Sequence, residues 1–332
     1  MKKQQNFLPE DISGAWDLIE KAKTITLLTH RKPDGDGIGA CGALEIVLER
    51  LGKMVVTKAV ETKAVETVYP DAPEFEYKRQ PCSVSIGKHT QVPDLLIACD
   101  TASYQQLYYP DEFKGIDLIN IDHHVSNSLK GTFNFVDAQS SSACEVVFLL
   151  LSVWGEAFGK TLIDKAVAEF LLSGILYDSQ VFHTQSTTTR TLRVAADLVD
   201  YGVDLFQLKV ELFSNKDPKV VQLWSKLLDR IEISKNGKAC WTFIMQHDLK
   251  AEGLQVASLV GFNNFLASIA GIDVTLLFYE TDDGKTKVSL RSKEYDVNKL
   301  AGKFGGGGHK HAAGILSDRL LGELMGEVVK SL

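Results

Sequence analysis

Long apolar runs, an excess of positive charge and paired cysteines are all scarce in this sequence. No apolar run approaches the ~18 residues that a membrane-spanning helix needs. Lys and Arg number 36 against 43 Asp and Glu, and the net charge of -7 has the wrong sign for holding long nucleic acid by bulk charge. The five cysteines include no close C-x-x-C pair, so neither a disulfide framework nor a structural zinc site is indicated. We therefore expect a cytoplasmic protein that makes no use of a membrane.

Three familiar catalytic and nucleotide-binding motifs are also missing. The glycine-rich segment at 305–314 lacks the Gly-Lys-Ser/Thr of a Walker A loop and the acidic partner of a dinucleotide fingerprint. No G-x-S-x-G elbow occurs, and Cys99 sits in an apolar run typical of strand core. The sequence therefore does not favour an ATPase, a dehydrogenase or a hydrolase with a serine or cysteine nucleophile.

The chain has the length and composition of two globular domains, with 332 residues of which 45% are hydrophobic and 24% charged. Short apolar runs alternate with helical patterns in the first two thirds, which is typical of parallel strands joined by crossover helices. After the polar stretch at 214–218 the pattern changes to a helix, then strands, with a hairpin signal at Asp282-Asp283-Gly284. We expect an α/β domain at 1–190, linker helices at 191–217 and a smaller α+β domain at 218–332.

The most informative segment lies where the first predicted strand, at 24–29, ends and a predicted helix, at 39–51, approaches. It reads His30-Arg-Lys-Pro-Asp34-Gly-Asp36-Gly-Ile-Gly39. Ligands bind at this edge of an open α/β sheet. Two carboxylates one residue apart, with an imidazole before them, can point at one or two divalent cations. The alternative is a solvated turn, since Asp and Gly are common in turns.

Two further predicted strands, at 95–99 and 116–121, are followed directly by Asp100 and Asp122. His123 and His124 come next, and an adjacent histidine pair at that position is hard to explain by packing. A mixture of carboxylate and imidazole suits Mn²⁺, Fe²⁺, Co²⁺ or Zn²⁺ better than an all-oxygen Mg²⁺ site, and we favour manganese. Taken singly, a histidine is more often structural, and we expect that of His89 and His247.

Asp178 follows the apolar segment at 170–177, which is predicted to be helical. A carboxylate buried there would be costly without a cation or a hydrogen-bond donor. The helix dipole also disfavours negative charge at a helix C-terminus. These two effects predict a metal partner for Asp178, and a solvent-exposed helix end is the alternative.

The second unusual segment is Gly305-Gly-Gly-Gly-His309-Lys-His-Ala-Ala-Gly314, which follows a basic strand carrying Arg291. Consecutive glycines allow backbone N–H groups to converge on an anion, with no side chain in the way. The segment therefore predicts a phosphate-binding nest. A flexible linker is the alternative.

In this order along the chain, the motifs resemble those of the DHH phosphoesterase superfamily. His30-x-x-x-Asp34-x-Asp36 resembles its first motif, Asp122-His123-His124 its signature, and the glycine-rich segment with Arg291 its associated C-terminal domain. Asp100 and Asp178 resemble the second and fourth motifs. The resemblance spans nearly the whole chain. It implies a parallel-sheet N-terminal domain, a smaller α+β C-terminal domain, and an active site in the cleft between them.

The resemblance also implies a role for each of these residues. It implies two Mn²⁺ ions per chain, which together activate water and clamp the attacking and leaving oxygens of a phosphate. Asp122 would orient His123 from behind the metal site, and His124 would act on the scissile phosphate or the leaving oxygen. One ion would be held by His30, Asp34 and Asp100, and the other by Asp36, Asp100, His123 and Asp178. The substrate would be held by Arg291, Gly306, Gly307, Gly308 and His309.

Among subfamilies the chain most resembles the nanoRNase/pAp-phosphatase group. This implies hydrolysis of short oligonucleotides to nucleoside monophosphates, hydrolysis of 3′-phosphoadenosine 5′-phosphate (pAp) to AMP, and a homodimer. His183 stands where such sequences often carry an arginine, so it is a candidate substrate-binding residue and bears on substrate preference. Three alternatives stay open: a phosphodiesterase for linear or cyclic dinucleotides, a family II inorganic pyrophosphatase, and a catalytically silent nucleotide-binding regulator.

Overall fold

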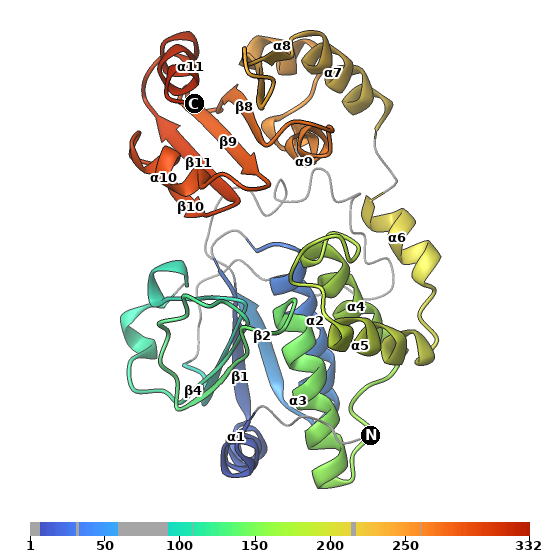
Figure 1. Cartoon of the computed structure of the whole chain (residues 1–332). Helices are drawn as coiled ribbons and strands as arrows, with labels where there is room; N and C mark the ends of the chain where they lie inside the picture. The colour runs from blue at the N-terminus through green and yellow to red at the C-terminus, as the bar shows by residue number, and fades with distance from the viewer. Residues whose placement is uncertain (1–6, 31–32, 59–91, 108, 214–216, 260) are drawn as a thin grey trace. The chain divides into compact units, whose positions relative to one another are not determined.

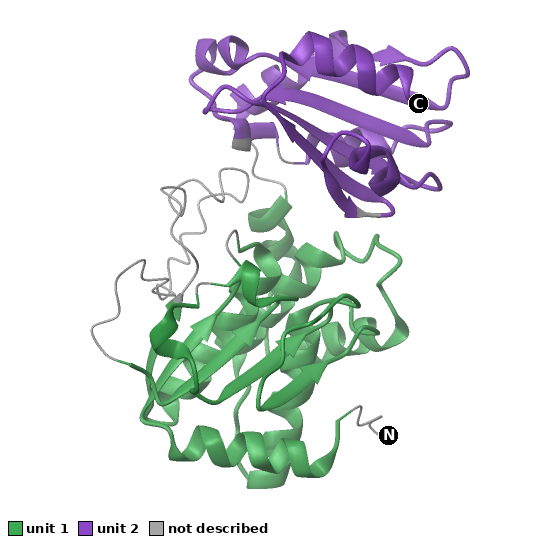
Figure 2. Cartoon of the chain, turned by 90° about the vertical axis from the view of Figure 1, so that its left-hand side faces the viewer, with its two compact units in different colours: residues 1–68, 75–214 green, residues 69–74, 215–332 purple. Residues whose placement is uncertain are grey.

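The computed structural model describes residues 7–30, 33–58, 92–107, 109–213, 217–259 and 261–332. Two compact units divide the chain, the first made of residues up to 68 and 75–214, the second of 69–74 and 215–332 (Figure 2). His89 and Cys82 lie outside the described residues. Within the described part of the chain, no helix is long and apolar enough to cross a membrane.

The first unit is built on a parallel five-stranded sheet, which confirms the predicted α/β class (Figure 1). Its strands are β1 (Thr24–Leu28), β2 (Met54–Lys58), β3 (Leu95–Cys99), β4 (Leu118–Asp122) and β5 (Phe133–Val136). All neighbours pair in parallel in the order β2-β1-β3-β4-β5. The chain adds β2 on one side of β1 and then β3, β4 and β5 on the other side. The carboxyl ends of β1 and β3 therefore form the topological switch point, where open sheets of this type bind ligands.

One face of this sheet carries the main hydrophobic core. Alternate side chains of the strands, such as Ile97 and Cys99 of β3, join buried residues of the helices, as the twofold alternation of a strand requires. The opposite face carries a smaller hydrophobic cluster, in which Leu96 of β3 and Phe113 are both buried. Phe113 comes from the segment that contains the short 3₁₀ helices η1 (Tyr104–Gln106) and η2 (Asp111–Phe113). The helices of the unit are α1 (Pro9–Lys21), α2 (Gly35–Arg50), α3 (Ala143–Phe158), α4 (Lys165–Asp178), α5 (Thr189–Asp200) and α6 (Leu205–Phe213).

Local sequence fixes where the helices that carry the site begin. Asp34 caps α2 by accepting from the backbone N–H groups of Asp36 and Gly37, and Ser142 caps α3 by accepting from Glu145. Helices α2 and α4 approach closely because Gly39 of α2 faces the backbone of Phe170, where a Cβ would lie 2.6 Å from its carbonyl oxygen. The close contact brings the first turn of α2 beside the last turn of α4.

Helices α5 and α6 cover most of the segment for which we predicted linker helices. Val194, Leu198, Leu208 and Leu212 are buried in the main core of the first unit. These helices pack on that unit through one apolar stripe each. A linking role for the segment stays a prediction.

The second unit is a mixed six-stranded sheet with helices, in agreement with the α+β prediction (Figure 1). Its strands lie in the order β10-β11-β9-β8-β7-β6, and only β7 and β8 run parallel. The hairpin signal is confirmed, since β8 and β9 are joined by the turn that contains Gly284. The strands are β6 (Glu232–Ile233), β7 (Ala239–Ile244), β8 (Val274–Glu280), β9 (Thr286–Ser292), β10 (Gly307–His309) and β11 (Ala312–Ser317). The helices are α7 (Pro218–Asp229), α8 (Gln246–Ala251), η3 (Val256–Leu259), α9 (Phe262–Ala267), α10 (Val297–Gly302) and α11 (Leu321–Lys330).

The glycine-rich segment differs in one respect from the predicted loop-like nest. Gly307–His309 form the edge strand β10, paired with β11 through Gly307 and Gly314. A Cβ on Gly306 or Gly308 would collide with the carbonyl oxygen of Gly314 or Ala312, and Gly308 has φ of 150°. The glycines are therefore required for close strand packing, and anion binding by this segment stays a prediction.

Candidate metal centre

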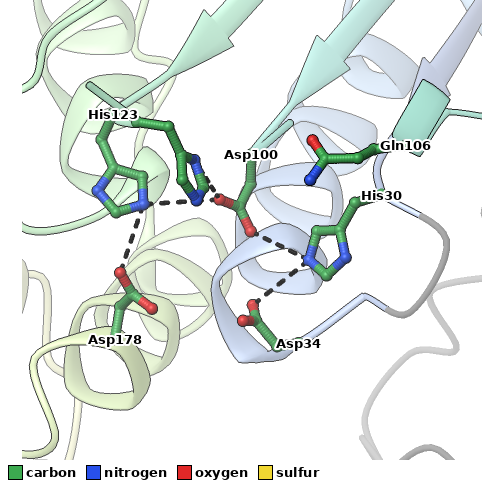
Figure 3. A pocket seen from close by; sticks show the side chains of 7 residues that line it. His30, Asp34, Asp100, Gln106, His123 and Asp178 are labelled. Atoms are coloured by element: carbon green, nitrogen blue, oxygen red, sulfur yellow. Dashed lines mark ion pairs between the residues drawn. The ribbon is translucent and has the colours of Figure 1, made fainter. Parts of the chain in front are cut away.

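The side chains predicted from three strand ends and one helix end lie around a single pocket of the first unit (Figure 3). His30 follows β1, Asp100 follows β3, His123 follows β4, and Asp178 is the last residue of α4. Asp36 lies behind them in the first turn of α2, fully buried. The lining of the pocket is His30, Asp34, Asp100, Gln106, His123, His124 and Asp178.

Asp100 is the centre of the cluster. One of its carboxylate oxygens, Oδ2, lies 3.4 Å from Nε2 of His30, and the other, Oδ1, lies 3.6 Å from Nε2 of His123. The residue has φ of 54°, a left-handed conformation that Asp tolerates better than most residues and that turns its carboxylate into the pocket. Asp100 therefore faces two groups of side chains at once.

The two groups flanking Asp100 each have the composition of a cation site. Nε2 of His30 is 4.0 Å from Oδ1 of Asp34. On the other side, Nε2 of His123 is 3.8 Å from Oδ2 of Asp36 and 3.4 Å from Oδ2 of Asp178. In each of these two groups, His30 with Asp34 and Asp100, and His123 with Asp36 and Asp178, the potential ligand atoms lie within 4.8 Å of one another. A third such group joins Asp100, Asp122, His123 and His124. The first group has the residues that the resemblance implies for one ion, and the second has those implied for the other ion except Asp100; cation binding by either stays a prediction.

Asp36 is held in place by the N-terminus of α3. Its Oδ2 accepts from the N–H of Ala143 at 2.5 Å and its Oδ1 from that of Cys144 at 2.9 Å. Free N–H groups and the helix dipole at that end both favour a carboxylate. These amides stabilise the ionised form of Asp36 alongside the ring of His123, which lies 3.8 Å away, and the orientation of Asp36 depends on where α3 begins.

Asp122 supports His124 and not the ring of His123, so the role that the resemblance implied for it differs from the observed contacts. Oδ1 of Asp122 lies 2.8 Å from Nδ1 of His124 and accepts only the backbone N–H of His123, and Oδ2 accepts from the amide of Asn127. Both rings line the pocket with their centroids 4.6 Å apart, and both approach Oδ1 of Asp100, at 3.6 Å for His123 and 3.7 Å for His124. Asp122 therefore positions the ring of His124 directly and that of His123 only through its backbone.

The pKa values reflect the crowding of acids and imidazoles. Burial, reinforced by the neighbouring carboxylate of Asp100, raises the pKa of Asp36 to about 7, and burial with the charge of Asp36 raises that of Asp178 to about 8. Burial would lower the pKa of His30 and His123, but the contacts with Asp100 and the charges of the other carboxylates, Asp34 beside His30 and Asp36 and Asp178 beside His123, together outweigh it and raise both to about 10. Burial would raise the pKa of Asp100, but its hydrogen bonds to His123 and His30 hold it well below the usual range.

The donor set fits divalent cations. Without a cation, protons on the imidazoles and on the carboxylates with raised pKa values reduce the repulsion among the crowded carboxylates. A bound cation would take the place of these protons. A divalent cation favours the ionised carboxylate and the neutral imidazole, and both are ligands for Mn²⁺ and its neighbours in the first transition series.

A buried ion network, which the sequence did not reveal, surrounds the start of α3. Arg190 of α5 donates through Nε to Oε1 of Glu145 and through Nη2 to Oδ2 of Asp137, both at 2.7 Å. The other oxygen of Glu145 accepts from the N–H and hydroxyl of Ser141 and from the hydroxyl of Thr191. The network fixes the loop that leads into α3, and through α3 it fixes the amides that hold Asp36.

The remaining predicted site residues lie outside this pocket. His183 is exposed and follows three left-handed residues, Gln180–Phe182, and it does not line the pocket. Arg291, Gly306, Gly307, Gly308 and the backbone of His309 belong to the second unit. His247 is exposed on α8, 3.4 Å from Asp248. Two residues of the site were not predicted: Gln106, which lines the pocket, and Asn127, which donates to Asp122.

Comparison with known proteins decides the family. The model of the DHH family N-terminal domain matches residues 24–175, and that of the DHHA1 domain matches residues 236–329. The bifunctional oligoribonuclease and PAP phosphatase NrnA of Bacillus subtilis is 32% identical over 308 residues, covering 91% of this chain and 93% of that protein. The chain belongs to the DHH family. The protein of the same name from Thermus thermophilus is 29% identical, covering 87% of this chain and 83% of its own length.

Solved structures agree with this family's fold. An exopolyphosphatase-related protein from Bacteroides fragilis superposes with a TM-score of 0.83 at 21% identity, covering 98% of this chain and 96% of its own. RecJ of Thermus thermophilus in complex with Mn²⁺ gives 0.57 at 15% identity, covering 97% of this chain and 54% of its own. The DHH motifs predicted from the sequence thus occur in a chain with the DHH-family fold.

Proposed function

We propose that this protein uses two Mn²⁺ ions to hydrolyse short oligonucleotides to nucleoside monophosphates and pAp to AMP. As a DHH-family member related to enzymes named for these activities, the chain is a hydrolytic phosphoesterase. The observation that carries the proposal is the double cluster around Asp100, with one imidazole and one or more carboxylates on each side. The family's need for divalent metal and the RecJ complex with Mn²⁺ support the choice of ion.

In this proposal His30, Asp34 and Asp100 hold one ion, and Asp36, Asp100, His123 and Asp178 hold the other. Bound divalent cations would supply Lewis-acid chemistry, activating water and neutralising phosphate charge. The protein's own contribution includes His124, whose Nδ1 is fixed by Asp122 at 2.8 Å. The atom that remains available to a substrate oxygen is Nε2, and it carries a proton only when the ring is an imidazolium. The contact with Asp122 raises the pKa of His124 and favours that form, so His124 can pass the Nε2 proton to the leaving oxygen and become a neutral imidazole.

Two cations of the second unit support binding of a nucleotide phosphate. Arg291 and Lys287 lie four residues apart on β9, and so on the same face of the sheet. Arg291 donates to the side chain of Asn264 and to a backbone carbonyl, and no carboxylate of the described residues lies within ion-pair distance of it. Burial lowers the pKa of both groups. Cations that lack an acidic partner are available to an anionic ligand, and we propose that Arg291 binds one end of the substrate, together with Gly306–His309.

The cellular setting is part of the same proposal. We infer a cytoplasmic homodimer. The free thiols of Cys41, Cys99, Cys144 and Cys240 support a reducing compartment. The net charge of -7 supports short substrates over long nucleic acid.

A product-resolved assay in Mn²⁺ tests this function. The panel compares pAp, pApA, 5′-phosphorylated two- to five-mers, cyclic dinucleotides and pyrophosphate, with EDTA-treated protein as the control. We expect mononucleotide release from the short oligomers and AMP from pAp, and loss of both in EDTA. Preferred opening of cyclic dinucleotides, release of phosphate from pyrophosphate alone, or tight binding of pAp without turnover would each contradict the proposal.

A further inference from the structure

Gln106 lies at the pocket but has no part in the two metal clusters. It ends η1, six residues after Asp100, and its exposed side chain lines the same pocket as the predicted ligands. The side-chain carbonyl of Gln106 accepts from the backbone N–H of Ala102 at 2.9 Å. The carbonyl of Ala102 in turn accepts from the N–H of Ser128 at 2.7 Å and from its hydroxyl at 3.1 Å. The carbonyl of Thr101, in the same peptide group as the N–H of Ala102, accepts from the amide of Asn127 at 3.0 Å, so the backbone that anchors Gln106 is itself fixed on both sides of Ala102.

The anchor determines which end of the amide faces the pocket. A backbone N–H can only donate, so the oxygen of the Gln106 amide must be the atom that points to Ala102. The NH₂ group is left on the side of the pocket, and in Figure 3 it is directed toward Asp100 and His30. Among the residues lining the pocket, Gln106 is the one neutral amide, and the others are carboxylates and imidazoles.

A neutral donor has a specific use at this position. An amide donates a hydrogen bond without adding charge beside Asp34 and Asp100, the carboxylates proposed to hold a cation. Phosphate oxygens need donors that the surrounding carboxylates cannot provide. A donor whose orientation is fixed before the substrate binds loses little freedom in making that contact.

We propose that Nε2 of Gln106 donates a hydrogen bond to a nonbridging oxygen of the phosphate that is hydrolysed. This makes Gln106 a substrate-binding residue that helps the pocket to recognise phosphate esters. The inference rests on the proposed phosphoesterase function, and it adds the residue that holds the reacting phosphate from within the first unit.

The test is the variant Gln106→Glu, with Gln105→Glu as the matched control. A carboxylate oxygen at 106 still accepts from Ala102, so the anchor remains while the donor becomes an anionic acceptor. Gln105 is exposed, precedes Gln106 in the same 3₁₀ turn and does not line the pocket, so it carries the same change in charge without the contact. For Gln106→Glu we expect kcat/KM on pAp and pApA to fall about 10²-fold or more, while Gln105→Glu stays within about threefold of wild type.

Two further measurements separate the possible reasons for a loss. Mn²⁺ affinity by calorimetry should be unchanged or tighter in Gln106→Glu, since the added charge attracts cations, and the melting temperature should not change. Wild-type kinetics in Gln106→Glu would overturn the inference, and so would a loss of activity matched by an equal loss of Mn²⁺ affinity.

If the wild-type protein turned over none of the panel, the proposed function would fail on its own. The affinity of the Mn²⁺-loaded protein for pAp, measured by calorimetry, would then test the role of Gln106. We expect weaker binding in Gln106→Glu and unchanged binding in Gln105→Glu. Unchanged binding in Gln106→Glu would contradict the contact.

Discussion

The Asp100→Asn variant is expected to lose about 10³-fold or more of kcat, because Asp100 faces both ligand groups and removal of its charge weakens both at once. A loss of several kcal/mol in transition-state stabilisation corresponds to a change of about this size. Asparagine has the same shape and also tolerates the left-handed backbone at this position, where φ is 54°. The fold should therefore persist, as judged by circular dichroism. Steady-state kinetics on pAp and calorimetric titration with Mn²⁺ measure the effect.

Asp111→Asn is the matched control for this variant. Asp111 is exposed on η2, where it pairs with Lys114 at 2.7 Å, and exposed pairs of this kind contribute little to stability. Its activity should equal that of the wild type. If Asp100→Asn retained near-normal kcat in Mn²⁺ while remaining folded, Asp100 would not be the residue shared by the two ions.

Removal of the Arg190 side chain should give the largest loss of stability among the substitutions considered. In Arg190→Met the buried carboxylate of Glu145 and that of Asp137 lose their cationic partner. Leaving a buried charge without its partner costs about 3 kcal/mol or more in the free energy of unfolding. Because the same network fixes the start of α3, whose amides hold Asp36, Mn²⁺ affinity should fall as well. Urea unfolding and calorimetry measure the two effects.

Arg193→Met tests whether these losses are specific to the network. Arg193 lies on the same helix, is exposed, and should tolerate the change with little loss of stability. The double variant Arg190→Met with Glu145→Gln should be less destabilised than the sum of the single variants, since each removes the other's unmet charge. Strict additivity, or a normal Mn²⁺ affinity in Arg190→Met, would disprove the coupling between this network and Asp36.

Much of the first unit could be predicted because its signals are local. Each buried parallel strand is a short apolar run, and a carboxylate directly after such a run lies at the carboxyl edge of the sheet. This is why Asp100, Asp122 and the segment around Asp34 could be assigned to one edge before their geometry was known. The order of the strands could not be predicted, since it depends on contacts between distant segments.

The residues that were missed act through tertiary contacts. Gln106 resembles any surface glutamine until the turn after β3 brings it to the pocket. The partners of Arg190 come from positions 45 and 53 residues away, and no spacing rule links them. The support of His124 by Asp122 depends on the backbone direction after β4, which determines which of two adjacent histidines turns toward the carboxylate.

The second unit was predicted less completely because its signals are weaker. The β8–β9 hairpin carries a clear turn sequence, whereas α8, α9 and α10 are short, and β10 consists largely of glycine. Runs of glycine have no side-chain pattern from which a strand can be recognised. In the structure the pairing of β10 with β11 decides its conformation.

The central claim is that two cations share Asp100, and a crystal grown in Mn²⁺ tests it most directly through anomalous difference density at the manganese edge. The account predicts two peaks in each chain, one contacted by His30 and Asp34, the other by Asp36, His123 and Asp178, with Asp100 reaching both. A single peak, peaks located elsewhere in the chain, or density absent at saturating Mn²⁺ would contradict it.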